Sequence, residues 1–157
     1  MPRKKSTRFN PKKEVSVMAW IENDGGSLLL VRQAAGQKPW TLPGGKVKRN
    51  ESLERALKRE VREETGLSVR ASEYLQMYDR PKRGAITILF RVLVQRQIDR
   101  MHFPAAEIAD LGFFDRLPAN ATPSAKFFWK SKDLPPLRPA WPKFGLRRKK
   151  PKKSDGR

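Results

Sequence analysis

The sequence contains no cysteine and only one histidine, His102. The lack of cysteine excludes disulfide frameworks, thiolate zinc sites and cysteine nucleophiles. A histidine zinc site or a serine–histidine triad is not expected with a single histidine. Apolar runs such as 27–31 and 85–90 are far shorter than the roughly 18 residues of a membrane-spanning helix. Polar catalysis must therefore depend on carboxylates, hydroxyls, lysine or arginine.

The second scarcity is negative charge. The chain has 35 Lys and Arg against 16 Asp and Glu, a net charge of +19. Six basic residues and no acid lie in residues 1–13, and nine basic residues and one acid lie in residues 138–157. Neither segment has an apolar pattern, so both are expected to be disordered arms. The remaining residues, 14–137, have the length of one domain.

No apolar stretch follows the basic N-terminus, so a secretory signal is not expected. We therefore expect a cytoplasmic location. Hydrophobic patterning predicts a mixed sheet packed against helices, which is an α/β fold. Strands are expected at residues 14–22, 27–33, 67–78, 85–94 and 111–114. A helix is expected at 52–65, a shorter one at 125–130, and a loop or bent strand at 38–45.

The predicted helix at 52–65 has an unusual arrangement of charge. Its apolar residues cover one face, and three carboxylates, Glu60, Glu63 and Glu64, lie close to that face on a helical wheel. One interpretation is a solvated helix with pairs such as Glu54 and Lys58. The alternative is a site for a hard divalent cation, because Mg²⁺ prefers oxygen ligands and would offset the repulsion among the carboxylates.

The wider segment favours the metal interpretation. Gly45 is followed after five residues by Glu51, and after seven more by Arg-Glu-Val-Arg-Glu-Glu-Thr-Gly-Leu at 59–67. This segment resembles the complete Nudix box. The preceding Trp-Thr-Leu-Pro-Gly-Gly at 40–45 is similar to the usual lead-in to that box. The resemblance extends from about residue 14 to residue 130.

The resemblance implies an α/β/α sandwich in which a loop–helix–loop motif presents glutamates to Mg²⁺ or Mn²⁺. Glu60 and Glu64 would be the principal metal ligands, together with the backbone carbonyl of Gly45. Glu63 would be a further ligand or the base that orients the attacking water. Family members differ in which glutamate is the base, so the motif leaves that role and the number of metal ions open. Arg59 would orient a box glutamate through a salt bridge, and Glu51 would brace the loop.

Three residues outside the box are further candidates. Glu107 is the candidate for an additional acid, because members of the family often draw one from a loop well after the box. Trp40 and Arg80 are candidate substrate contacts, through base stacking and phosphate binding respectively. His102 is expected to have no catalytic part.

The resemblance leaves three functions open. The leading one is a Mg²⁺-dependent pyrophosphohydrolase acting on a nucleoside diphosphate linked to another moiety, of the nucleoside triphosphate or nucleotide sugar type. The second is the same chemistry at RNA 5′ ends. The third is a non-catalytic Nudix-like module that binds nucleic acid. The basic termini keep nucleic acid open as a partner without sequence preference, whereas no membrane partner and no particular oligomeric state are predicted.

Overall fold

The computed structural model describes residues 12–95 and 101–133. Nearly all of both predicted basic arms lies outside the described residues, and the domain boundaries stay predictions. The elements occur in this order: β1 (Glu14–Trp20), β2 (Leu28–Gln33), β3 (Trp40–Thr41), β4 (Gly44–Lys46), α1 (Leu53–Thr65), β5 (Val69–Arg80), the 3-10 helix η1 (Pro81–Arg83), β6 (Ala85–Val94), β7 (Ile108–Phe114), α2 (Pro123–Trp129) and the 3-10 helix η3 (Lys130–Asp133).

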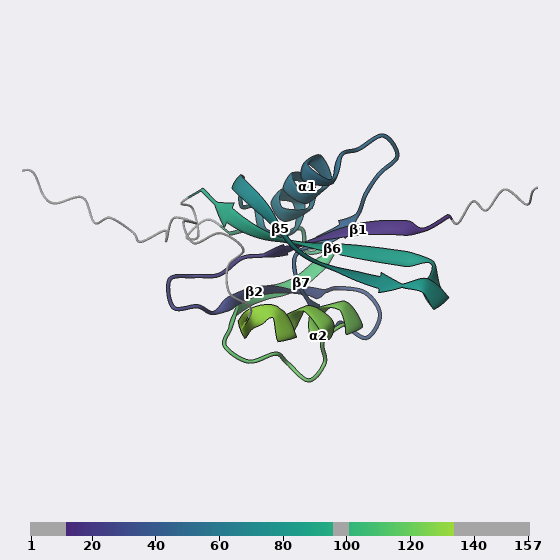
Figure 1. Cartoon of the computed structure of the whole chain (residues 1–157). Helices are drawn as coiled ribbons and strands as arrows, with labels where there is room; N and C mark the ends of the chain where they lie inside the picture. Colours follow the sequence, from purple (N-terminus) through teal and green to yellow (C-terminus); the bar gives the residue numbers. More distant parts are fainter. Residues whose placement is uncertain (1–11, 96–100, 134–157) are drawn as a thin grey trace, which may run out of the picture.

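The strands form two sheets. The larger has the order β4-β1-β6-β5, with β1 and β6 parallel and the other pairs antiparallel, and the smaller has the antiparallel order β3-β2-β7. Helices α1 and α2 lie on opposite sides of the strands (Figure 1). The predicted α/β fold, an α/β/α sandwich with a mixed sheet, is therefore confirmed.

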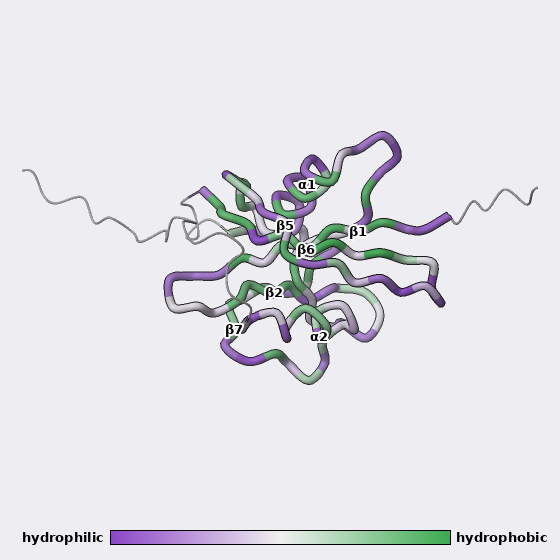
Figure 2. The backbone as a smooth tube through the Cα atoms, in the orientation of Figure 1, coloured by the Kyte–Doolittle hydropathy of each residue, from purple (hydrophilic) through white to green (hydrophobic). Residues whose placement is uncertain are grey.

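Two apolar clusters hold the layers together. The first lies beneath α1 and includes Val17 of β1 together with Leu57 and Val61 of α1. The second lies toward α2 and includes Trp20, Leu30 and Phe128. Figure 2 shows hydrophobic residues concentrated in the central strands and hydrophilic residues in the connections. Burying each of these large side chains contributes roughly 1.5–3 kcal/mol, so α1 is anchored firmly to the sheet that carries β4.

The elements differ from their expected bounds where long-range pairing outweighs local pattern. Strand β5 continues two residues past the expected end, because Arg80 still pairs with Ala85 across the tight η1 turn. Strand β7 begins three residues early, because its polar Asp110 pairs with Arg32 of β2. The expected loop or bent strand at 38–45 is replaced by two short strands, β3 and β4; β4 extends one residue beyond this segment and pairs with β1.

No helix in the described part of the chain is both long and apolar enough to cross a membrane. The cytoplasmic location stays a prediction.

Candidate active site

Helix α1 is defined at both ends by local capping. The Ser52 hydroxyl accepts a hydrogen bond from the backbone N–H of Arg55, and Gly66 ends the helix in the left-handed conformation with φ of 73°. The apolar face of α1 packs on the sheet. One edge of the helix consequently lies against strand β4, which carries Gly44 and Gly45.

Glu64 is the buried carboxylate of this site. It is 9% exposed, and its Oε2 accepts a hydrogen bond of 2.8 Å from the backbone N–H of Gly44. Burial raises the pKa of Glu64 to about 8, although the Gly44 hydrogen bond acts in the opposite direction. The negative charges of Glu60, Glu107 and Glu63 raise that pKa further. Glu64 therefore lies where positive charge would be strongly favourable.

Glu60 occupies the space beside Gly45. A Cβ atom at Gly45 would lie only 2.6 Å from Glu60 Oε1 and 2.8 Å from Oε2, so no other residue fits there without moving this carboxylate. The Glu60 side chain is 14% exposed. Burial raises its pKa and the neighbouring Arg59 guanidinium partly opposes that shift. The missing side chain at position 45 thus lets a carboxylate approach the backbone closely.

Arg59 connects the acidic residues. Its Nε and Nη2 donate hydrogen bonds of 2.8 and 2.9 Å to the two carboxylate oxygens of Glu51, which is a bidentate pair. Its Nη1 donates to Glu60 Oε1 at 2.6 Å and to Glu63 Oε2 at 3.1 Å, and Nη2 also reaches the Lys46 carbonyl at 3.1 Å. The hydrogen bonds from Arg59 lower the pKa of Glu51 to about 2. The expected salt bridge between Arg59 and a box glutamate is present.

The three glutamates are not equally placed, although the helical wheel groups them at the apolar edge. The Glu63 side chain is 48% exposed, whereas Glu60 and Glu64 are largely covered. Glu64 lies against β4, where its carboxylate accepts the Gly44 hydrogen bond, whereas the carboxylate of Glu63 is held by Arg59. Glu63 is therefore the carboxylate that solvent reaches most readily.

Glu107 comes from a different segment of the chain, outside the box at 45–67. It lies just before β7, and its backbone carbonyl accepts a hydrogen bond from the Ala34 N–H at 2.9 Å. Its charge raises the pKa of Glu64, so it lies near enough for electrostatic interaction. The preceding loop contacts the end of α1, where the His102 N–H donates to the Thr65 carbonyl at 3.2 Å. Glu107 therefore interacts electrostatically with the glutamate site, and its role as an additional acid stays a prediction.

The contacts of Trp40 and Arg80 are with residues outside this group. Trp40 packs against the second apolar cluster, with its ring centroid 4.6 Å from that of Phe114. The Arg80 guanidinium lies 5.4 Å from the centre of the Tyr78 ring, and it donates a hydrogen bond to the Thr87 hydroxyl. Each residue has a packing role, and their substrate contacts stay predictions.

The donor set has the chemistry that a hard divalent cation requires. Glu60 and Glu64 offer carboxylate oxygens that repel each other at a covered position, and Gly45 places backbone directly beside them. No three acidic or histidine side chains of the described residues already surround a common point. Arg59 explains this, because it draws Glu60 and Glu63 toward its own guanidinium. The carboxylate oxygens of Glu60 and Glu64 fit Mg²⁺ or Mn²⁺ once Glu60 turns from Arg59 toward Glu64, a movement that leaves the hydrogen bond between Arg59 and Glu63 in place.

Two contributors were missed by sequence reasoning. The Gly44 N–H holds Glu64, and the Lys46 carbonyl helps to hold Arg59. Backbone groups carry no residue-type signal, so only the Gly-Gly pair itself hinted that the chain approaches the helix closely here.

Comparison with known proteins places these residues in a family. A model of the NUDIX domain matches residues 12–130. Among curated relatives, the chain is 34% identical over 90 residues to a MutT-like protein of Streptomyces ambofaciens, covering 57% of this chain and 58% of the relative. It is 42% identical over 72 residues to the CTP pyrophosphohydrolase of Escherichia coli, covering 45% and 53% of the two chains.

A shorter match joins the chain to an RNA pyrophosphohydrolase of Saccharophagus degradans, at 49% identity over 47 residues, covering 30% of this chain and 28% of the relative. The chain therefore spans less than two thirds of each of these relatives. Among solved structures, the MutT NUDIX hydrolase from Burkholderia pseudomallei superimposes with a TM-score of 0.64 at 25% identity, covering 75% of this chain and 96% of the other. The family model covers most of the chain, and the box predicted at residues 45–67 lies within it, so the chain belongs to the Nudix family.

Proposed function

We propose that this protein is a Mg²⁺- or Mn²⁺-dependent pyrophosphohydrolase of a nucleoside diphosphate linked to another moiety. The substrate class is a nucleoside triphosphate or a nucleotide sugar. The observation that carries the proposal is the placement of Glu60 and Glu64 on one edge of α1, against the Gly44–Gly45 backbone. The CTP pyrophosphohydrolase relative supports the same substrate class.

The covered and the exposed glutamates of the site would have different roles. A bound Mg²⁺ or Mn²⁺ would offset the negative charge of the diphosphate and of the covered glutamates. Glu60, Glu64 and the Gly45 carbonyl are the groups that would hold it. Glu63 is more exposed and is the better placed of the glutamates to accept a proton from the attacking water. Arg59 sets the direction of that carboxylate through its 3.1 Å hydrogen bond.

The reaction requires no covalent protein intermediate. Water forms a new P–O bond, and the phosphoric anhydride P–O bond breaks to release the second phosphate group, with a glutamate removing the proton of the water. Alignment and charge stabilisation suffice for this displacement, which agrees with a chain that lacks cysteine. Glu107 is the candidate that adds a further carboxylate from the loop before β7.

The experiment is a substrate screen with product masses. CTP, the other nucleoside triphosphates, nucleotide sugars and 5′-triphosphorylated RNA are each incubated with the full chain in ¹⁸O-labelled water, once with Mg²⁺ and once with Mn²⁺. A nucleoside monophosphate together with pyrophosphate or a sugar phosphate would identify the substrate, and the position of the label would identify the attacked phosphorus. Turnover of none of these compounds with either metal would contradict the proposal and favour a non-catalytic binding module.

A second candidate, hydrolysis at RNA 5′ ends, is favoured by the RNA pyrophosphohydrolase relative and by the net charge of +19. The same screen separates the candidates, because this function predicts faster turnover of 5′-triphosphorylated RNA than of a free nucleotide.

A further inference from the structure

Four strand ends meet at one end of the larger sheet. At the start of β1, Glu14 pairs with Ala85, the first residue of β6. Across the hairpin, Ala85 also pairs with Arg80, the last residue of β5. On the other side of β1, Ser16 pairs with Lys46, the last residue of β4. Residues that enter or leave these four strands therefore lie at the same end of the molecule.

This end is strongly basic. Six of its cationic side chains are exposed, and they come from the entry to β1, the η1 turn, and the end of β4 with the connection to α1. We call this set the basic end; it consists of Lys12, Lys46, Lys48, Arg49, Lys82 and Arg83. Figure 2 shows hydrophilic residues at the start of β1, at the tip of the β5–β6 hairpin and in the connection from β4 to α1.

The nearby acids do not neutralise the basic end. Glu14 pairs with Lys46 at 2.8 Å, and Asp79 pairs with Lys13, outside the set, also at 2.8 Å. Glu51 in the connection to α1 is taken up by Arg59. The other five cations of the basic end form no salt bridge within residues 12–95 and 101–133. They leave an uncompensated positive field that favours a polyanion.

The position of this field indicates which polyanion. Lys46 follows Gly45 directly in the chain, so the basic end begins beside the glutamate site. Large exposed apolar side chains, which a lipid surface would favour, occur among the described residues only at Tyr74 and Met77 in the middle of β5. The basic end has charge and no such apolar anchor. Phosphates spaced along a flexible strand match it better than a bilayer does.

We propose that the basic end binds the sugar–phosphate backbone of a single-stranded nucleic acid, along a path that leads away from the glutamate site. This inference rests on the proposed function only in placing one end of the nucleic acid at the glutamate site. Binding of the sugar–phosphate backbone itself requires no hydrolysis. Such contacts give affinity with little sequence preference.

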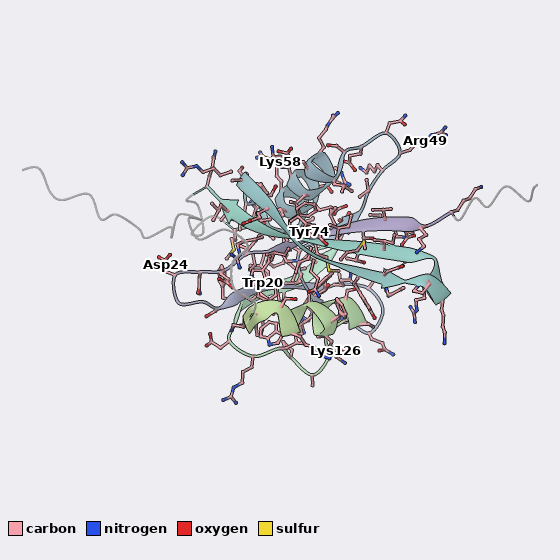
Figure 3. The ribbon with its side chains drawn as sticks, viewed as in Figure 1. Trp20, Asp24, Arg49, Lys58, Tyr74 and Lys126 are labelled. Carbon is pink, nitrogen blue, oxygen red and sulfur yellow. The ribbon has the colours of Figure 1, made fainter. Side chains whose placement is uncertain are left out.

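The test compares two triple variants of the full chain that lose equal charge. The first is Arg49→Gln, Lys82→Gln and Arg83→Gln in the basic end. The matched control replaces three exposed cations near α2, written R116Q, K126Q and K130Q. Arg49 and Lys126 lie on opposite sides of the strands (Figure 3). Binding of a labelled single-stranded RNA of about 12 nucleotides is followed by fluorescence anisotropy in EDTA, from about 50 to 300 mM KCl.

For the basic-end variant, the slope of log K against log salt should fall by about 2, since three phosphate contacts at about 0.7 each are lost. Its affinity at about 0.1 M KCl should fall roughly tenfold, and the control should stay within about twofold of wild type. Equal losses in both variants, or no loss in either, would overturn the proposal. Vesicles containing phosphatidylserine provide the second arm: if the basic-end variant loses vesicle binding but keeps RNA binding, the surface is for membranes and the proposal is wrong.

Turnover of a free nucleotide by the same variants separates this proposal from the proposed function. The basic-end variant should hydrolyse it at the wild-type rate within about twofold. If the wild-type chain binds RNA through the basic end but hydrolyses nothing, the proposed function fails while this inference stands.

Discussion

The buried carboxylate of Glu64 predicts how the metal-free protein responds to pH. The folded protein holds the pKa of this group at about 8, against an ordinary value of 4.5. A raised pKa means that the folded state binds the proton more tightly than the unfolded state does. Stability from this group is therefore complete below about pH 4.5 and is lost as the pH rises toward 8. Replacing Glu64 with Gln removes the titration but keeps an oxygen that can accept the Gly44 hydrogen bond.

The size of the effect follows from the two pKa values. Each unit of difference corresponds to about 1.4 kcal/mol, so wild type should lose roughly 3 kcal/mol relative to Glu64→Gln between pH 5 and pH 8. For a domain of this size, 1 kcal/mol shifts the melting temperature by about 2–4 °C. The melting temperature of Glu64→Gln relative to that of wild type should therefore rise by about 10 °C between pH 5 and pH 8. Mg²⁺ should reverse part of the difference, because it favours the ionised carboxylate.

The assay is thermal unfolding in EDTA at several pH values, followed by circular dichroism. The matched control is Glu54→Gln, which removes an exposed carboxylate from the same helix and breaks only its pair with Lys58 at 2.6 Å. The control should move little relative to wild type from pH 5 to pH 8. A constant difference between Glu64→Gln and wild type across this range would refute the claim that Glu64 is held in its neutral form by burial.

Other expected outcomes concern activity and the metal. Glu63→Gln should lower kcat at saturating Mg²⁺ by at least about 100-fold with an unchanged melting temperature, and near wild-type kcat would remove Glu63 from the site. Millimolar Mg²⁺ or Mn²⁺ should raise the melting temperature of wild type but not of Glu60→Gln, and equal shifts would place the ion elsewhere. Arg59→Lys should lower kcat at least about tenfold, because lysine cannot make the bidentate pair with Glu51; full activity would show that this pair positions nothing. Deleting residues 1–11 and 134–157 should leave kcat on a free nucleotide within a few-fold, and collapse of turnover in a truncation that still melts cooperatively would show that an end segment completes the site.

Much of the fold and the core of the site follow from local signals. The bounds of α1 were predictable because Ser52 and Gly66 are residues that cap helices through their own chemistry. Helix α2 begins two residues before its expected start at 125, because Thr122 caps it and Pro123 opens it. The strand at Ala85–Val94 was predictable from a run of mostly apolar residues, interrupted by Thr87 and Arg91. The box residues were identified by their resemblance to the Nudix box, and the structure places Arg59 against three of its glutamates, Glu51, Glu60 and Glu63.

The remaining features depend on contacts between distant parts of the chain. Strand β4 has only three residues, two of them glycine, and it forms because β1 offers an unpaired edge. The burial of Glu64 depends on the approach of that strand, whereas Glu63 one residue earlier is half-exposed. A helical wheel treats these two neighbours alike because it contains no information on what packs against the helix. The gathering of cations at the basic end depends on strand register in the same way.

The glutamates of α1 are proposed to hold a divalent cation, and direct measurement of Mn²⁺ binding tests this. The signal of free Mn²⁺ in electron paramagnetic resonance is recorded as protein is added, without nucleotide, for wild type, Glu60→Gln, Glu64→Gln and the control Glu54→Gln. Wild type and Glu54→Gln should reduce the free signal equally, with tighter binding at pH 8 than at pH 6 because Glu64 must lose its proton. Glu60→Gln and Glu64→Gln should each weaken binding by at least about tenfold. Undiminished Mn²⁺ binding in both of these variants would contradict the account.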